Sequence, residues 1–329
     1  MQELTSGGSL CIGLRFAQDD RCTVSPLSVN PSSADLPISP LGEHHGVQFL
    51  LARDELTHPE LPGNKWRKLK YNLREADRLG LNTLLTFGGA YSNHLAAVAA
   101  AGRLTGRRTI GFVRGDEMAG RPLNPTLARA RADGMELHFL DRETYRRKHE
   151  PAVLAALLHD TGPAYVLPEG GSNTLALPGC AELARELLAR TDFDVLAVAC
   201  GTGGTLAGLL TGLNGQRQAL GISALKGADF LRADIDQLTQ QATGRTYANW
   251  ELRTDYHGGG YARLTPELRQ FIVDFQQRHA ILLDPIYTGK LLFGLLDLAA
   301  KGHFRRGSTV VAIHTGGLQA WAGFGGEPG

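Results

Sequence analysis

Short apolar segments alternate along this chain with longer segments of helical pattern, and no other feature constrains the fold as strongly. Parallel strands need such an order, because each connection between them uses a crossover helix that packs on one face of the sheet. The sequence therefore predicts an α/β protein with a three-layer αβα architecture and mostly parallel, twisted sheets. We expect strands at Thr83–Phe87, Thr109–Val113, Glu136–Leu140, Tyr165–Leu167, Val195–Ala199, Leu220–Ser223 and Thr309–Ile313, and helices at Ser92–Gly102, Asn124–Asp133, Ala181–Ala189, Leu206–Leu213, Pro266–Arg278 and Leu291–Ala300.

The length of 329 residues predicts two domains rather than one. The Ser/Pro/Asp-rich and weakly patterned residues 1–37 are interpreted as an N-terminal arm. We expect residues 38–81 and 166–329 to form a large domain and residues 82–165 a smaller α/β domain. Ligands of such sheets bind at the carboxyl ends of the strands, so polar, glycine-rich segments that follow strands are the candidates for a site.

The composition excludes several classes of partner. A net charge of +1 favours neither nucleic acid nor an anionic membrane surface. Apolar runs such as Leu95–Ala101 are far shorter than the ~20 residues that a membrane-spanning helix needs. Asp19 and Asp20 stand where a signal peptide would be apolar, and the four cysteines are scattered without a C-x-x-C pair. We therefore expect a cytoplasmic protein with reduced thiols.

The segment Gly63–Lys70, with the sequence GNKWRKLK, is the first candidate for chemistry. Asn64 is expected to be a helix N-cap, which puts Lys65 and Lys68 on one helical face. One amine could then bind an aldehyde while the other balances a phosphate. Neighbouring cations lower the pKa of a lysine, as imine formation requires. A basic, solvent-exposed helix would give the same spacing.

Two more segments follow predicted strands and begin helices. Gly88–His94, GGAYSNH, places a hydroxyl, an amide and an imidazole at the positive end of a helix, although plain capping by Ser92 or Asn93 also explains it. Gly201–Thr205, GTGGT, offers converging backbone N–H groups and hydroxyls to a single phosphate. A dinucleotide fits less well, because Leu206 takes the last glycine position of G-x-G-x-x-G. No metal site is expected.

The last two segments are Asp284–Lys290, DPIYTGK, and His314–Gly317, HTGG. Both are expected to line the cleft at the edge of the sheet, the second directly after the last predicted strand. Tyr287, and Tyr261 after three glycines, are equally well explained as buried structural tyrosines.

Together the five segments resemble those of the tryptophan-synthase-β-like, fold-type II enzymes, which depend on pyridoxal 5'-phosphate (PLP). Within that group they are similar to the family of 1-aminocyclopropane-1-carboxylate (ACC) deaminases and D-cysteine desulfhydrases. The resemblance runs from about Pro40 to Phe324, with the segments in the family's order. It implies PLP as the cofactor, a small amino acid as the substrate and a homodimer as the assembly.

The resemblance also implies roles for single side chains. Lys65 would bind the cofactor through a Schiff base, Asn93 would reach the 3' oxygen of its ring, and Thr288 would meet the pyridine nitrogen. The implied catalytic set is Lys65, Ser92, Tyr261 and Tyr287, and the implied cofactor-binding set is Lys65, Lys68, Asn93, Gly201, Thr202, Gly203, Gly204, Thr205, Thr288 and Thr315.

One position separates the branches of this family. ACC deaminases have glutamate after the tyrosine of the fourth segment, where this chain has Thr288. A carboxylate keeps the ring nitrogen protonated, whereas a hydroxyl supports a neutral ring, which suits elimination of a good leaving group from Cβ. The resemblance therefore favours conversion of D-cysteine, or a related β-substituted amino acid, to pyruvate, ammonia and sulfide. The alternatives are ACC deaminase, a serine/threonine dehydratase, racemase or β-replacement synthase, and a non-catalytic module that binds a phosphate ligand.

Overall fold

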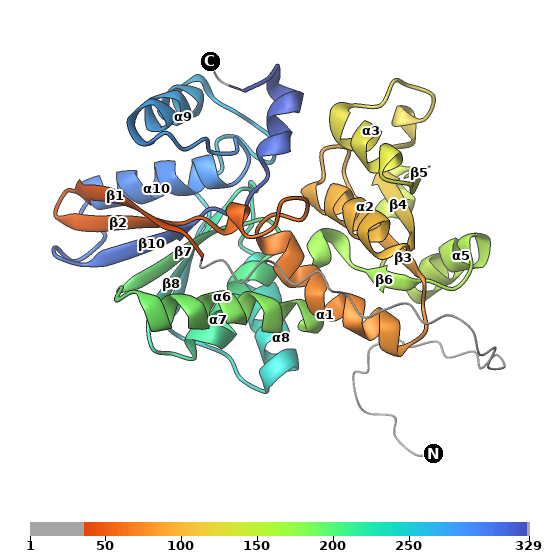
Figure 1. Ribbon diagram of the computed structural model, residues 1–329, viewed down its shortest axis with the longest axis horizontal. Helices are drawn as coiled ribbons and strands as arrows, with labels where there is room; N and C mark the ends of the chain where they lie inside the picture. Colours follow the sequence, from red (N-terminus) through yellow and green to blue (C-terminus); the bar gives the residue numbers. More distant parts are fainter. Residues whose placement is uncertain (1–35, 328–329) are drawn as a thin grey trace. The chain divides into compact units, whose positions relative to one another are not determined.

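The computed structural model describes residues 36–327, which form two sheets flanked by helices (Figure 1). The larger sheet has the strand order β1-β2-β10-β7-β8-β9 and the smaller one β5-β4-β3-β6. All neighbouring strands are parallel except β1 and β2, which form an antiparallel pair. The strands are β1 Ile38–His44, β2 Val47–Ala52, β3 Thr83–Gly88, β4 Arg108–Arg114, β5 Met135–Leu140, β6 Tyr165–Leu167, β7 Val195–Cys200, β8 Gln218–Ser223, β9 Trp250–Arg253 and β10 Thr309–Ile313.

The predicted α/β fold with mostly parallel sheets is confirmed, and each predicted strand and helix overlaps an observed one. The pattern did not predict β1, β2, β9 or the helices α4, α5 and α8. The N-terminal arm expected at residues 1–37 lies almost wholly outside the described residues. The helices are α1 Asn64–Arg78, α2 Asn93–Thr105, α3 Pro125–Ala132, α4 Arg142–Arg146, α5 Pro151–Thr161, α6 Leu177–Arg190, α7 Gly204–Leu213, α8 Leu231–Thr243, α9 Pro266–His279 and α10 Thr288–Ala300.

Strand β7 shows why the larger sheet is covered on both faces. Successive side chains of a strand point to opposite faces, and both sets are apolar here. Leu196 and Val198 belong to the core formed with α6, α7 and α8, whereas Ala197 and Ala199 belong to the core formed with α9 and α10. Figure 1 shows these two groups of helices on opposite sides of the sheet. A strand buried on both faces is typical of a parallel sheet.

The smaller sheet has a compact aromatic core on one face. Phe87 of β3 stacks on Phe112 of β4 with ring centroids 5.6 Å apart, and Tyr145 of α4 packs edge-on against Phe87 at 6.3 Å. Leucines of α5 pack against the same cluster. Helix α2 begins directly after β3, so the polar residues between them lie at the carboxyl end of that strand.

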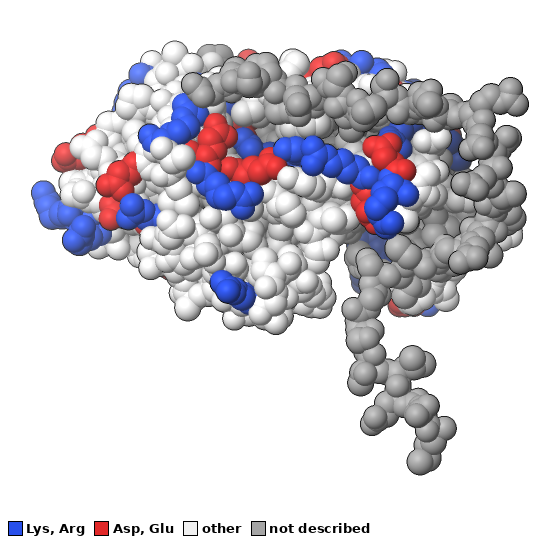
Figure 2. All heavy atoms as spheres, turned by 60° about the horizontal axis from the view of Figure 1, so that its bottom comes forward, with Lys and Arg blue, Asp and Glu red and all other residues white. Residues whose placement is uncertain are grey.

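Charged side chains of both signs are interspersed on the face that Figure 2 shows. Ion pairs join many of the described charged side chains, for example Lys70 of α1 with Glu182 of α6 at 2.7 Å. Such mixing agrees with the near-zero net charge. Among the described residues, no helix combines the length and apolar character needed to span a membrane.

Candidate active site

Helix α1 carries Lys65 in its first turn, and its start differs from the prediction. The N-cap is Gly63, with φ +63°, so the prediction that Asn64 caps the helix was wrong. Asn64 is buried, and its side-chain amide donates a hydrogen bond to the hydroxyl of Thr205 at 3.0 Å. The side chain of Asn64 thus binds a residue distant in sequence instead of capping the helix. This contact joins α1 to the glycine-rich segment Gly201–Thr205.

Lys65 is in an environment that favours a neutral amine. Burial, and to a smaller degree the nearby charge of Lys68, lower the pKa of its ammonium to about 7, against weaker opposing effects of Cys180 and Asp284. Its side chain nevertheless keeps partial exposure to solvent. A neutral, reachable amine is the form that can attack a carbonyl or accept a proton.

Lys68 is at the centre of a polar network that contains the third sequence segment. Its ammonium donates hydrogen bonds to the carbonyl of Gly170 and to the hydroxyl of Ser172, both at 3.0 Å. Ser172 Oγ in turn lies 2.6 Å from Thr202 Oγ1. Helix α7 begins beside these groups at Gly204 without a side-chain cap, so its first backbone N–H groups are available to an anion. The cluster has the donors that a phosphate requires.

His94 is a buried imidazole with unused hydrogen-bonding capacity. Neither of its ring nitrogens has a hydrogen-bond partner among the described residues. Burial, together with the charges of Lys65 and Lys68, holds its pKa well below the usual value. Because a Cβ on Gly171 would lie 2.7 Å from the ring, only a glycine lets the backbone approach this closely. Buried polar atoms without partners point to a missing ligand or water.

Tyr287 and Tyr261 form a pair at the N-terminal end of α10. Their rings meet edge-on with centroids 6.1 Å apart. A Cβ on Gly201 would lie 3.2 Å from the hydroxyl of Tyr287, so the phosphate-type segment also borders this pair. Burial raises the pKa of Tyr287 well above its usual value, and the Tyr261 phenol raises it further. Both phenols therefore keep their protons near neutral pH and can donate hydrogen bonds.

Thr288, the first residue of α10, is fixed through its backbone. The carboxylate of Asp284 accepts hydrogen bonds from the N–H groups of Ile286, Tyr287 and Thr288, at 3.0, 2.7 and 2.7 Å. The hydroxyl of Thr288 is fully buried and has no hydrogen-bond partner among the described residues. A buried hydroxyl without a partner costs free energy unless a ligand completes it.

Ser92 directly precedes α2, and Asn93 is its first residue. The side-chain oxygen of Asn93 accepts a hydrogen bond from the amide of Gln319 at 2.9 Å. Ser92 is the N-cap of α2, and its hydroxyl accepts the backbone N–H of Leu95 at 3.2 Å. The capping that we considered as an alternative is thus confirmed for Ser92, and no hydrogen bond joins it to either tyrosine within residues 36–327.

Thr315, the last of the expected cofactor-binding residues, is buried just after β10. Its backbone carbonyl lies against Gly63, where a Cβ would be only 2.3 Å away. This contact brings the end of β10 to the start of α1, beside Lys65. The expected residues from all five segments therefore meet around the carboxyl ends of β3, β7 and β10.

Sequence reasoning missed the segment after β6. Ser172 and the carbonyl of Gly170 bind Lys68, yet the three-residue strand β6 gives only a weak pattern. The signal that could have found them is the glycine pair at 170 and 171 followed by a serine, at a strand end. Gln319, in a turn of 3-10 helix, had no such signal.

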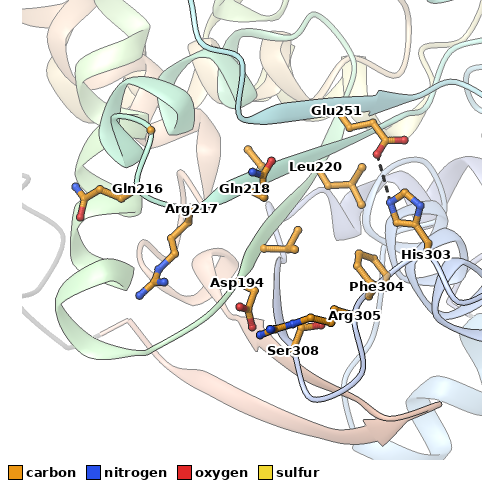
Figure 3. A pocket seen from close by; sticks show the side chains of 13 residues that line it. Asp194, Gln216, Arg217, Gln218, Leu220, Glu251, His303, Phe304, Arg305 and Ser308 are labelled. Carbon is orange, nitrogen blue, oxygen red and sulfur yellow. Dashed lines mark ion pairs between the residues drawn. The ribbon is translucent and has the colours of Figure 1, made fainter.

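A separate recess of about 430 Å³ lies at the amino ends of strands of the larger sheet, away from the carboxyl ends that carry the candidate site (Figure 3). It is lined by the amino ends of β7 and β8, including Val195 and Gln218. Two of its charged side chains are already in ion pairs, His303 with Glu251 at 3.3 Å and Arg217 with Asp192 at 2.7 Å. None of the expected site residues lines it, so it does not belong to the candidate active site.

The chain matches a known family over most of its length. Residues 30–316 match the family described as "Pyridoxal-phosphate dependent enzyme". The "D-cysteine desulfhydrase" of Serratia proteamaculans is 32% identical over 307 residues, covering 86% of this chain and 90% of that protein. The "Bifunctional D-cysteine desulfhydrase/1-aminocyclopropane-1-carboxylate deaminase, mitochondrial" of Arabidopsis thaliana is 32% identical over 301 residues, covering 84% of this chain and 74% of that protein.

A solved structure supports the same relationship. The crystal structure described as an "ACC deaminase homologue" superimposes with a TM-score of 0.80 at 31% identity. The match covers 90% of this chain and 94% of the other. Relatives with either activity name are therefore about equally similar to this chain in sequence identity.

Proposed function

Because the chain belongs to the family of pyridoxal-phosphate-dependent enzymes, we propose that it catalyses elimination from D-cysteine or a related β-substituted amino acid. With one water, which supplies the keto oxygen, the products would be pyruvate, ammonia and sulfide, or the corresponding thiol. The family supplies the cofactor, PLP. The choice of reaction depends on a single observation, the buried and unpartnered hydroxyl of Thr288.

The residues around Lys65 fit PLP in chemistry and number. Lys68, Ser172, Thr202 and the uncapped start of α7 are donors suited to a phosphate. Among the residues of the five segments, the ring nitrogens of His94 and the hydroxyl of Thr288 are buried and lack partners within the described part of the chain. A phosphorylated pyridine would complete such groups, and the amine of Lys65 would hold its aldehyde.

When bound, PLP supplies an electron-withdrawing ring that weakens the bonds at Cα of an attached amino acid. Lys65 is the group proposed to move the proton. Its Nζ, with a pKa lowered to about 7 by burial and by Lys68, can accept the Cα proton and return it. The electron pair left at Cα then forms the double bond as the β-substituent departs with the electrons of its own bond.

The two tyrosines and Ser92 are proposed to orient the substrate. The phenols of Tyr287 and Tyr261 hold their protons, so each can donate a hydrogen bond to the substrate carboxylate or the leaving sulfur. The proposed role of Ser92 is compatible with its cap, because a hydroxyl that accepts a backbone N–H still has a proton to donate. Asn93 and Thr315 are proposed to border the cofactor.

Thr288 carries the choice between reactions. A hydroxyl at the pyridine nitrogen can share a hydrogen bond with a neutral ring, whereas a carboxylate would hold a proton there. A neutral ring stabilises a negative charge at Cα less well, so it favours departure of a leaving group over chemistry that needs a lasting carbanion. ACC has no leaving group and no Cα proton, and its ring opening needs the stronger withdrawal.

ACC deaminase remains the second candidate function. Relatives of both names match this chain, and the plant relative carries both. The purified, PLP-loaded protein should be assayed for keto-acid release from D-cysteine, L-cysteine, further β-substituted amino acids and ACC. We expect kcat/KM for D-cysteine to exceed that for ACC by on the order of 100-fold. Equal or faster release from ACC would overturn the proposal.

The proposal extends to assembly and compartment. We propose a homodimer that works in the cytoplasm, with a division into a large domain (residues 38–81 and 166–329) and a smaller one (residues 82–165). The free, buried thiols of Cys180 and Cys200 support a reducing compartment. Light scattering during size-exclusion chromatography would measure the molar mass of the purified protein and so test the dimer.

A further inference from the structure

Lys290 is a buried lysine of α10 that lies outside the cofactor-binding residues discussed so far. Only 1% of its surface is exposed. Its ammonium donates a hydrogen bond to the carbonyl of Gly260 at 2.7 Å and lies 3.5 Å from the carbonyl of Ala224. Among the described residues it forms no ion pair, and Asp284 acts on it only from a distance.

Stability alone does not explain a lysine at this position. Burying an ammonium is unfavourable, and two neutral carbonyls recover only part of that cost. An apolar side chain of similar length would fill the same space at a lower cost. The lysine is therefore better explained by what its two contacts hold in place.

The contact at Gly260 belongs to a loop with little rigidity of its own. Gly258, Gly259 and Gly260 have φ values of +59°, +91° and +131°, a backbone that glycine adopts most easily. The hydrogen bonds within the loop are local. Gly260 N donates to the carbonyl of His257 at 3.1 Å, Gly259 N to the ring Nδ1 of His257 at 2.9 Å, and Arg263 N to the carbonyl of Gly260 at 3.2 Å. Glycine-rich backbone loses the most conformational freedom when ordered, so a tie from outside has a large effect.

Lys290 provides that tie, and it connects two residues of the active site. Tyr261 follows Gly260 directly, and Tyr287 lies three positions before Lys290. The two rings meet at 6.1 Å with an angle of 65°. We propose that Lys290 is a positioning residue, which holds the loop of residues 257–263 so that Tyr261 packs against Tyr287 and faces the substrate. The last part of this proposal rests on the proposed function, in which Tyr261 contacts substrate.

The test compares two Lys→Met variants beside the same loop. Lys290→Met keeps the length of the side chain but removes the donor. Lys226→Met is the matched control, because Lys226 is exposed, with its Cβ 3.8 Å from the Cβ position of Gly260 and no hydrogen bond to the loop. Lys290→Gln is a rescue variant that keeps a donor. Each PLP-loaded protein is measured for hydrogen exchange of the peptide containing residues 257–263, for thermal melting, and for kcat and KM with D-cysteine.

We expect Lys290→Met to accelerate exchange in this peptide by about tenfold or more, with melting no lower than in the unaltered protein. Lys226→Met should change neither, and Lys290→Gln should restore most of the protection. In turnover, Lys290→Met should lower kcat/KM about tenfold, which corresponds to about 1.4 kcal/mol. In a Tyr261→Phe background the same substitution should have less than about a twofold further effect, because the two residues act together.

If hydrogen exchange of residues 257–263 is unchanged in Lys290→Met, Lys290 does not hold the loop and the proposal is wrong. If Lys290→Met accelerates exchange and yet lowers kcat/KM by the same factor with and without Tyr261→Phe, Lys290 does not act through Tyr261. If Lys290→Met does not fold, Lys290→Leu replaces it, and failure of both to fold would show a structural role instead. If the unaltered enzyme does not turn over D-cysteine, the proposed function fails, and the exchange comparison still decides whether Lys290 holds the loop.

Discussion

The side-chain amide of Asn64 donates a hydrogen bond to the hydroxyl of Thr205 at 3.0 Å, although 141 positions separate them in sequence. This contact connects the helix that carries Lys65 with the segment proposed to bind the phosphate of PLP. The elements proposed to hold the aldehyde and the phosphate of the cofactor are thereby fixed to each other. Pre-organisation of this kind strengthens binding, because less order must be created when the ligand arrives.

Asn64→Ala should therefore weaken PLP binding as well as the fold. Both partners are buried, so we expect a loss of about 1–2 kcal/mol of stability and roughly a tenfold increase in the Kd for PLP. Titration of the apoprotein with PLP, followed by near-visible absorbance, measures the second quantity. Thr205→Val should have a similar effect, and the double variant should lose little more. Additive losses in the double variant would contradict a shared hydrogen bond.

Lys65→Ala should abolish both covalent attachment of PLP and turnover. Borohydride reduction followed by mass spectrometry should find the cofactor on Lys65 in the unaltered protein and on no lysine in the variant. Lys290 is another buried lysine, but its ammonium already binds the carbonyl of Gly260. Attachment that persists in Lys65→Ala would move the role to another lysine. Lys226→Met serves as a control that should keep full attachment.

Capture of PLP by the apoprotein should depend on pH through Lys65. Its amine is protonated below a pKa of about 7 and neutral above it, because burial and Lys68 disfavour the charged form. The capture rate should rise by about tenfold per pH unit below pH 7 and level off above it. Lys68→Met should move this bend to higher pH, since one of the effects that lower the pKa is removed. Stopped-flow absorbance measures the profile, and a bend near pH 10 in the unaltered protein would refute the assignment.

The same shift predicts how Lys65 affects the stability of the apoprotein. Its pKa is lowered from 10.5 to about 7 on folding, so between these values the unfolded chain binds more protons than the folded one. The contribution of Lys65 to stability therefore increases as pH rises from about 7 to about 10.

Substitutions at Gly203 and Gly204 should act by different routes. A Cβ at Gly203 would lie 2.6 Å from Ile235 of α8, at a φ of +75°, so Gly203→Val should mainly strain the fold. A Cβ at Gly204 would lie 2.4 Å from Ser172 Oγ, so Gly204→Ala should displace the hydroxyl that binds Lys68. We expect Gly204→Ala to raise the Kd for PLP by roughly tenfold or more with a smaller loss of stability than Gly203→Val. Thermal melting with and without PLP separates the two, and equal ligand-induced shifts would contradict the distinction.

The sequence was sufficient to predict the sheet type, most of the helices and the segments that form the site. Those predictions depended on local pattern and on the rule that ligands bind at strand ends. The structure places Gly201–Thr205 directly after β7, where that rule expects a site. Contacts between distant segments were beyond its reach. Asn64 was expected to be a cap because nothing local shows that Thr205 would lie beside it.

Other parts of the fold gave too weak a pattern. The antiparallel pair β1 and β2 was not predicted, because a register shift between Pro40 and Gly42 interrupts the alternation of buried and exposed residues. Ser172 was missed because its importance comes from Lys68, on a helix 104 positions earlier. For Ser172 the missing information was a tertiary partner rather than a residue type.

Thr288→Glu tests the residue that carries the choice of reaction. Its backbone N–H is bound by Asp284, and its hydroxyl is buried without a partner among the described residues. Under the proposed function, a carboxylate placed here would face the pyridine nitrogen of PLP. The carboxylate should hold a proton on that nitrogen and give extra absorbance at longer wavelength when an amino acid is added. Elimination from D-cysteine should slow by about tenfold or more, because the stabilised carbanion releases the β-substituent less readily.

Thr288→Gln is the matched control for this substitution, since it adds the same bulk to a fully buried position without the charge. It should slow turnover by crowding but should not produce the new absorbance. ACC turnover need not appear in Thr288→Glu, because ring opening also requires the substrate to be placed against Ser92, Tyr261 and Tyr287. If Thr288→Glu and Thr288→Gln give the same spectrum and the same loss, the group at position 288 acts through its volume. The preference for elimination would then have to arise from how the two tyrosines orient the substrate.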